Sequence, residues 1–153
     1  MQALGLAWSS PMSDLEQRIF ASFRAQGLMA MLGAELVHVA EGEVHIALSP
    51  RPELGQQHGH IHAGVLASIL DSACGYAAMT VAQPGLGVLT VEFKLKFIRP
   101  VAGADRFVAI GKVTNKVGTT LTMCEGEIIG EQGAQQEEIA VMQATISNVP
   151  NNP

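Results

Sequence analysis

The chain has 153 residues, of which 48% are hydrophobic and 15% charged, and its formal net charge is −5. So few charges on a chain of this size favour an oligomer in which part of the apolar surface is covered. The acidic balance argues against general nucleic-acid binding.

The N-terminal part predicts a leader followed by a helix. Residues 1–12 are expected to form a flexible leader ahead of one domain over residues 13–149. Ser13 and Glu16 have the spacing of a capping box, and the apolar residues that follow recur at helical intervals. A short apolar turn then leads to Gly33.

Two features favour a cytoplasmic location. The N-terminus lacks the basic stretch, apolar run and cleavage site of a signal peptide. Cys74 and Cys124 lie in apolar runs, so we expect buried thiols in a reducing compartment, and neither has the setting of a nucleophile.

Apolar and polar residues alternate with a period of two in several segments, which predicts strands. The strands are expected over residues 35–40, 43–48, 90–97, 106–117, 119–129 and 137–147. Short turns between consecutive strands indicate an antiparallel meander. Val91, Phe93, Leu95 and Phe97 alternate with polar residues, which predicts one buried face for that strand.

A long helix is predicted over residues 64–82, after a polar loop with glycine and histidine over residues 51–61. Polar residues and a glycine interrupt its apolar character, which argues against a membrane span. Because the helix is too apolar to lie on the surface, the sheet must curl around it. The predicted fold is α+β, with an N-terminal helix and a long central helix wrapped by a curved antiparallel sheet of five to six strands.

Asp71 is the one formal charge of this helix. A carboxylate in an apolar helix is costly unless it is paired, hydrogen-bonded or functional. One interpretation is a carboxylate satisfied by a neighbouring donor, and the other is a buried general base or nucleophile. At the start of the helix, the N–H groups of residues 63–65 could hold an oxyanion, and Gly64 allows close approach of a ligand. An ordinary helix start with a glycine is the alternative.

His58, His60 and His62 alternate ahead of the helix, but no carboxylate or cysteine accompanies them, so we expect no metal site there. One of them is expected to orient the loop. Lys94, Lys96, Arg99, Lys112 and Lys116 concentrate positive charge on the middle strands. They form either a solvated face or a rim that receives phosphates.

Two motifs resemble the hotdog-fold acyl-CoA thioesterases, in particular the phenylacetate-pathway (PaaI-like) group. Gln56, Gly59 and His62-Ala63-Gly64 precede Asp71, which follows His62 by nine residues. Residues 90–100 are similar to the family's strand that begins with a hydroxyl residue and ends in a proline, and residues 117–119 are similar to its turn. Ala63 replaces the first glycine of the family's His-Gly-Gly, and the resemblance spans residues 30–147.

The resemblance implies an acyl-CoA thioesterase without cofactor or metal. Two subunits would join their sheets edge to edge, in a homodimer at least and a homotetramer by preference. Asp71 of one subunit would attack the thioester or activate water, and the backbone of Gly64 in the other would hold the thioester oxygen. Gln56 would orient the carbonyl or water, His62 would brace the loop and Thr90 would position water. The residues implied to contact substrate are Ala63, Lys94, Arg99 and Gly118.

Two other functions fit the same fold. A hotdog dehydratase or hydratase would need a catalytic histidine in a different setting, and no Asp-x-Asn-Pro-x-His-like run is present. A non-catalytic acyl-CoA-binding protein would keep the substrate tunnel but could lose the acid, which this chain retains as Asp71.

Overall fold

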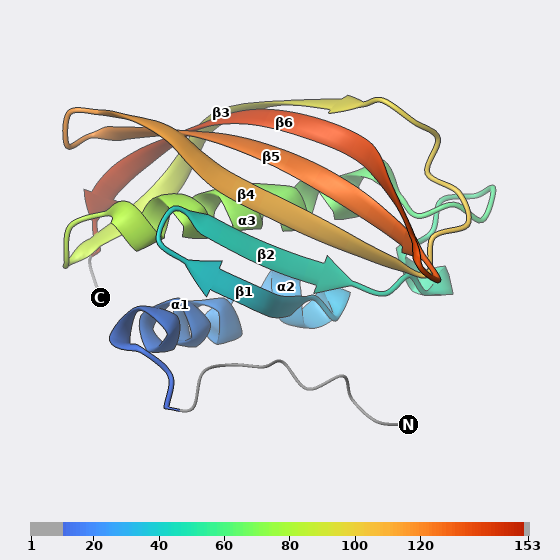
Figure 1. Ribbon diagram of the computed structural model, residues 1–153, viewed down its shortest axis with the longest axis horizontal. Helices are drawn as coiled ribbons and strands as arrows, with labels where there is room; N and C mark the ends of the chain where they lie inside the picture. Colours follow the sequence, from blue (N-terminus) through green and yellow to red (C-terminus); the bar gives the residue numbers. More distant parts are fainter. Residues whose placement is uncertain (1–10, 152–153) are drawn as a thin grey trace.

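The computed structural model describes residues 11–151, so most of the predicted leader, residues 1–10, lies outside the described residues. The helices are α1 (Asp14–Ala25), α2 (Gly27–Leu32), the 3₁₀ helix η1 (Pro52–Leu54) and α3 (Ala63–Val81). The strands are β1 (Glu35–Ala40), β2 (Glu43–Leu48), β3 (Leu86–Phe97), β4 (Arg106–Val117), β5 (Leu121–Gln132) and β6 (Gln135–Pro150). Figure 1 shows their arrangement, with the sheet curved over α3.

Capping residues determine where the N-terminal helices begin and end. Ser13 and Glu16 form the predicted capping box at the start of α1. The segment expected to be a short apolar turn is the helix α2, which ends at Gly33 with a φ of 71°. Arg51 donates hydrogen bonds of 2.7 Å to the carbonyl of Leu32 and 2.6 Å to that of Met31. A cation on the last carbonyls of a helix stabilises its C-terminus.

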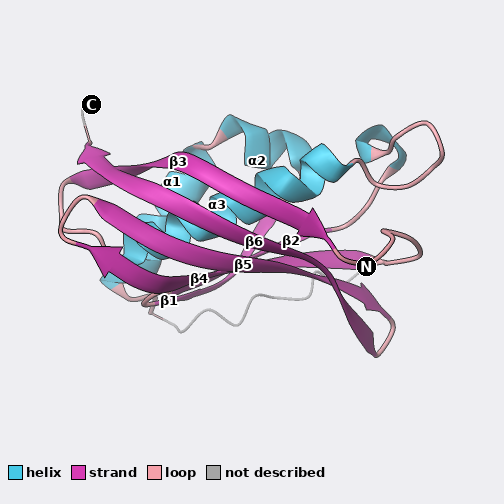
Figure 2. Ribbon diagram, turned by 90° about the horizontal axis from the view of Figure 1, so that it is seen from above, coloured by secondary structure: helices cyan, strands magenta, loops and turns pink. Residues whose placement is uncertain are grey.

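The six strands form one antiparallel sheet in the order β1-β2-β4-β5-β6-β3. The predicted meander holds for β4 to β6, but β3 pairs with β6 and not with its successor β4. The connection over residues 98–105 contains Pro100 and Gly103 and is too long for a tight hairpin. It carries the chain across the sheet to β4, which pairs with β2, and β3 remains an edge strand, as Figure 2 shows.

Close contact between α3 and the sheet defines the core. Leu66, Ile69 and Leu70 are fully buried against the concave face. A side chain at Gly111 of β4 would place its Cβ 2.5 Å from the carbonyl group of Ala73, so only glycine allows this approach. By length and composition α3 could cross a membrane, but here it is the buried core helix of the sheet. The predicted α+β hotdog fold is confirmed.

The apolar face of β3 is more open than the alternation predicts. Val91 is 59% exposed and Phe93 44% exposed, so the expectation that the described chain buries this face is wrong. An irregularity in register between Thr90 and Glu92 keeps Thr90 on the same face as Phe93, toward the side where α3 lies. Because β3 is the last strand of the sheet, only one of its two long sides pairs with another strand of residues 11–151.

Candidate active site

A carboxylate and a hydroxyl meet between α3 and β3. The Thr90 hydroxyl on β3 donates a hydrogen bond of 2.7 Å to Oδ1 of Asp71 in the middle of α3. Thr90 is thus a neighbouring donor of the kind that one interpretation of Asp71 expects, and Asp71 is only partly buried in the described chain. The reason is that its side of α3 faces the open β3 edge and not the centre of the sheet.

A cavity of about 470 Å³ extends from this pair between α1, α3 and the start of β3. Its wall carries a chain of polar contacts that the sequence motifs did not indicate. Ser72 donates to the side-chain oxygen of Gln26 at 3.0 Å, and Gln26 donates to the Tyr76 hydroxyl at 3.4 Å. Burial raises the pKa of Tyr76. Ser72 and Tyr76 lie four residues apart on one face of this mostly apolar helix, and this spacing is the signal that the sequence offers for the contacts.

The start of α3 is capped by a side chain. His62 is the N-cap residue, and its Nδ1 accepts a hydrogen bond of 2.8 Å from the N–H of Gly64. A Cβ on residue 64 would lie 3.0 Å from that nitrogen, so glycine leaves room for the cap. The Gly64 N–H therefore has a partner here, unlike the free donor that the sequence predicts. Ala63 is the first helical residue, and no non-glycine residue of the described chain has a positive φ, so alanine fits this position.

The loop before the helix is held by its own hydrogen bonds. The side-chain oxygen of Gln56 accepts hydrogen bonds from the N–H groups of His58 and His60. Gln56 therefore orders its loop, and its hydrogen bonds do not extend to Asp71. His58, His60 and His62 do not gather as a ligand group within residues 11–151.

Gly64 and Asp71 are separated along one helix. They are seven residues apart in α3, which corresponds to about 10 Å at 1.5 Å per residue. A thioester carbonyl must lie about 3 Å from both an oxyanion donor and an attacking group. The backbone positions of the two groups in one chain are therefore farther apart than a single carbonyl spans.

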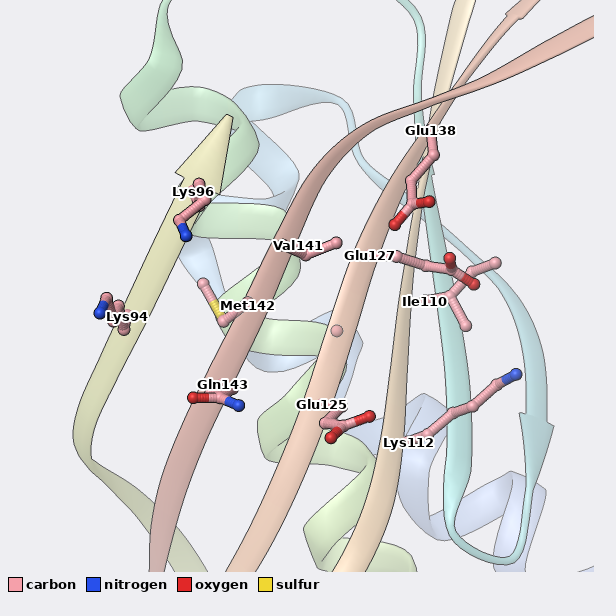
Figure 3. A pocket seen from close by; sticks show the side chains of 11 residues that line it. Lys94, Lys96, Ile110, Lys112, Glu125, Glu127, Glu138, Val141, Met142 and Gln143 are labelled. Atoms are coloured by element: carbon pink, nitrogen blue, oxygen red, sulfur yellow. The ribbon is translucent and has the colours of Figure 1, made fainter. Parts of the chain in front are cut away.

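The predicted substrate contacts are spread over the molecule. Lys94 lies in a groove on the outer face of the sheet with Lys96, Lys112 and three glutamates (Figure 3). The α3 helix, which carries Asp71, lies behind the sheet in that view. The Arg99 guanidinium contacts Glu137 at 3.2 Å. Gly118 occupies the β4–β5 turn with a φ of 60°, and nearby Lys116 donates to the carbonyl of Val81 at the C-terminal end of α3.

The cysteines are inert by their surroundings. Both thiols are buried, and burial raises the pKa of Cys74 strongly and that of Cys124 to about 12. The predicted burial of both thiols is confirmed. Thiolates are the reactive form of cysteine, so these pKa shifts agree with the prediction that neither residue is a nucleophile.

A curved antiparallel sheet around one central helix defines a hotdog fold. The chain belongs to the thioesterase superfamily, whose sequence profile matches residues 58–137, and the protein is a thioester hydrolase. A thioesterase family protein from Silicibacter pomeroyi superposes with a TM-score of 0.84 at 37% identity, over 90% of this chain and 99% of that one.

Two proteins of phenylacetic acid degradation share the fold. The PaaI protein from E. coli gives a TM-score of 0.78 at 21% identity, over 88% of this chain and 93% of that one. The PaaI protein from Thermus thermophilus gives 0.70 at 25% identity, over 81% of this chain and all (100%) of that one. The predicted membership in the PaaI-like group is confirmed.

Proposed function

We propose that the protein hydrolyses acyl-CoA thioesters to a free acid and CoA, with Asp71 as general base or nucleophile. The observation that carries the proposal is the 2.7 Å hydrogen bond from Thr90 to the Asp71 carboxylate, on the wall of a cavity large enough for an acyl group. The hydroxyl fixes one carboxylate oxygen and leaves the other free for water or substrate. Thr90 is therefore a positioning residue for the reacting oxygen.

The two roles of Asp71 differ in where the new bond forms. As a base, Asp71 takes a proton from water while the hydroxide adds to the carbonyl, and the C–S bond breaks to release the CoA thiol. As a nucleophile, Asp71 adds to the carbonyl itself, CoA leaves, and water cleaves the mixed anhydride. Single turnover in oxygen-18-labelled water, followed by mass spectrometry of the peptide with Asp71, detects the nucleophilic role when water attacks the aspartyl carbon of the anhydride. Trapping of the anhydride with hydroxylamine detects this role when water attacks the acyl carbon.

A second copy of the chain is proposed to complete the site. The axial separation of about 10 Å between Gly64 and Asp71 supports an oxyanion donor from another copy. The exposed β3 edge offers the surface for this copy, because Leu89, Val91 and Phe93 are 62%, 59% and 44% exposed. A long apolar edge strand that stays uncovered promotes uncontrolled association. We therefore infer a homodimer through β3, with a homotetramer as the favoured larger assembly.

The start of α3 would receive the thioester oxygen from the partner's active site. The N–H groups of Ala63 and Gly64 lie at the positive end of a 19-residue helix. His62 would release the Gly64 N–H to the developing oxyanion and continue to brace the helix start. Gln56 would orient the carbonyl or water after assembly.

Lys94, Arg99 and Gly118 are proposed to contact the CoA part of the substrate in the assembled enzyme. Arg99 would exchange its partner Glu137 for a phosphate, since bidentate contacts of arginine with phosphate are strong. We further propose that residues 13–149 act as one domain and that the enzyme works in the cytoplasm.

Hydrolysis of a panel of acyl-CoAs, followed by detection of the free thiol, tests the proposal. The panel should vary in chain length and include aryl groups. Asp71→Asn should lower kcat by about 10²–10⁴-fold, the usual contribution of a general acid or base. Asp105→Asn is the matched control, because Asp105 is an exposed carboxylate outside the cavity.

The outcomes separate the candidate functions. Full activity of Asp71→Asn would refute its catalytic role. Measurable acyl-CoA binding without thiol release from any member of the panel would instead favour an acyl-CoA-binding protein. Hydration of an enoyl-CoA without thiol release would favour a hydratase.

A further inference from the structure

Three potential metal ligands gather on the outer face of the β1–β2 hairpin. His38 of β1, Glu43 of β2 and His45 of β2 each offer a donor atom, and these atoms lie within 4.8 Å of one another. The rings of His38 and His45 are 4.6 Å apart between centroids, and Nε2 of His45 lies 2.6 Å from Oε1 of Glu43. Within residues 11–151 no other group of three such side chains comes together in this way.

The strand register builds this cluster. His38 is directly opposite His45, and Glu43 precedes His45 by two residues and so shares its face. A bulge between Leu36 and His38 reverses the alternation of β1, because Leu36 is buried in the core whereas His38 is exposed. Bulges of this kind re-aim side chains. Without the extra residue, His38 would face the core and the cluster would not exist.

Two imidazole nitrogens and a carboxylate oxygen suit a divalent cation of intermediate hardness, such as Zn²⁺. Zn²⁺ binds imidazole nitrogen at about 2.0–2.1 Å and carboxylate oxygen at about 2.0–2.2 Å, so two ligands of a tetrahedral site lie roughly 3.3 Å apart. Donor atoms within 4.8 Å reach such positions by small side-chain rotations. The proton of neutral His45 can move from Nε2 to Nδ1, which leaves the Nε2 lone pair for the metal.

Two charged residues on the neighbouring strands affect cation binding at this cluster: Lys112 disfavours it and Glu125 favours it. Lys112 of β4 is opposite Glu43, but Glu125 of β5 is opposite Lys112 in turn. The side chains of His45 and Glu43 are only 24% and 34% exposed, so the donors are partly held in place before a metal arrives. Partly pre-formed ligands reduce the ordering cost of binding.

We propose that His38, Glu43 and His45 bind one divalent transition-metal ion, with zinc as the representative ion, on the outer face of the β1–β2 edge. This edge lies at the opposite end of the sheet from β3 and the active-site carboxylate. The metal would join the first two strands and stabilise them. It takes no part in thioester hydrolysis.

Isothermal titration of the full-length, tag-free protein with zinc chloride tests this site. Wild type should bind about one zinc per chain. His38→Ala and His45→Ala should each weaken binding more than about tenfold, since even indirect partners of metal ligands contribute ten- to a hundredfold. The double variant His58→Ala with His60→Ala is the matched control and should bind like wild type.

Two further readouts make the test independent of folding defects. Wild type with cobalt(II) should show visible absorption bands that His38→Ala lacks, and zinc should raise the Tm of wild type but not of that variant. His38 is exposed, so its removal should leave the metal-free fold intact. Zinc binding of equal strength to wild type and to His45→Ala would overturn the proposal. Loss of zinc binding in the His58→Ala, His60→Ala double variant alone would also overturn it, and so would an absence of zinc binding to wild type.

Discussion

Mixing two inactive variants would test whether each active site is shared between two copies of the chain. Asp71→Asn removes the carboxylate, and Gly64→Pro removes the N–H that we propose to hold the thioester oxygen. The two positions are about 10 Å apart along α3 in one chain. In a dimer, each site would therefore combine Asp71 of one copy with Gly64 of the other. A mixed dimer has one site with both substitutions and one site with neither.

The expected recovery follows from this geometry. Each variant alone should keep less than about 1% of the activity, because a general base contributes about 10²–10⁴-fold and an oxyanion donor about 10²–10³-fold. Equal amounts that exchange subunits at random give about half mixed dimers, each with one intact site of two. Thiol release should therefore return to about a quarter of the wild-type rate after the variants are unfolded in urea and refolded together.

Controls separate a shared site from a damaged fold. Gly64→Ala keeps the N–H and adds a Cβ 3.0 Å from Nδ1 of His62, so it should be much more active than Gly64→Pro. Both inactive variants should keep the elution volume and Tm of a folded dimer. If they exchange subunits and no activity returns, the shared site is refuted, because a site within one chain would be defective in every copy.

Three further predictions concern single side chains. Thr90→Val removes a hydrogen bond to a charged group, which contributes about 1.5–3 kcal/mol. This substitution should lower kcat/KM for thiol release about ten- to a hundredfold. Thr90→Ser keeps the hydroxyl and should keep most of the wild-type kcat/KM. Gly111→Ala would place a Cβ 2.5 Å from the α3 backbone and should lower the free energy of unfolding, measured in urea, by about 1–3 kcal/mol. Gly27→Ala is the control, because a Cβ at that position would meet no atom within 4 Å and should not destabilise the protein. Burial lowers the pKa of His45, so the unfolded chain binds its proton more readily, and stability in metal-free urea titrations should fall as pH drops below about 6.5.

Each of these has a clear contrary result. Equal kcat/KM for Thr90→Val and wild type would mean that the hydroxyl does not position the carboxylate. A Gly111→Ala protein as stable as Gly27→Ala would contradict the close approach of α3 to β4. If His45→Gln shows the same loss of stability below pH 6.5 as wild type, the titration belongs to other groups.

Local signals are enough for most elements of the fold. The strands β1, β2 and β4 have the predicted bounds because alternation, a Glu-Gly turn and nearby prolines or glycines define them within a few residues. The pairing of β3 with β6 depends on contacts about fifty residues apart, which alternation does not encode. The open face of β3 is not predictable for a related reason, since alternation indicates a face to be buried but not which molecule buries it.

The candidate site is predictable only in part. Asp71 stands out because a charge in an apolar helix is unusual, and Thr90 because it begins a motif of the family. The contact of Gln26 with Ser72 depends on how α1 packs against α3, which no local pattern reports. The cluster around His38 depends on a single bulge, and strict alternation would assign that residue to the opposite face.

Backbone hydrogen bonds join the two ends of the loop ahead of α3. Gly55 pairs with Ile61, Gln56 donates to the His60 carbonyl at 2.7 Å, and His62 donates to the Leu54 carbonyl at 2.8 Å. The conformational entropy of this segment is therefore lost when the protein folds and not when a thioester arrives. In the proposed dimer, this loop would therefore meet the substrate as a preformed wall and would not close over it as a lid.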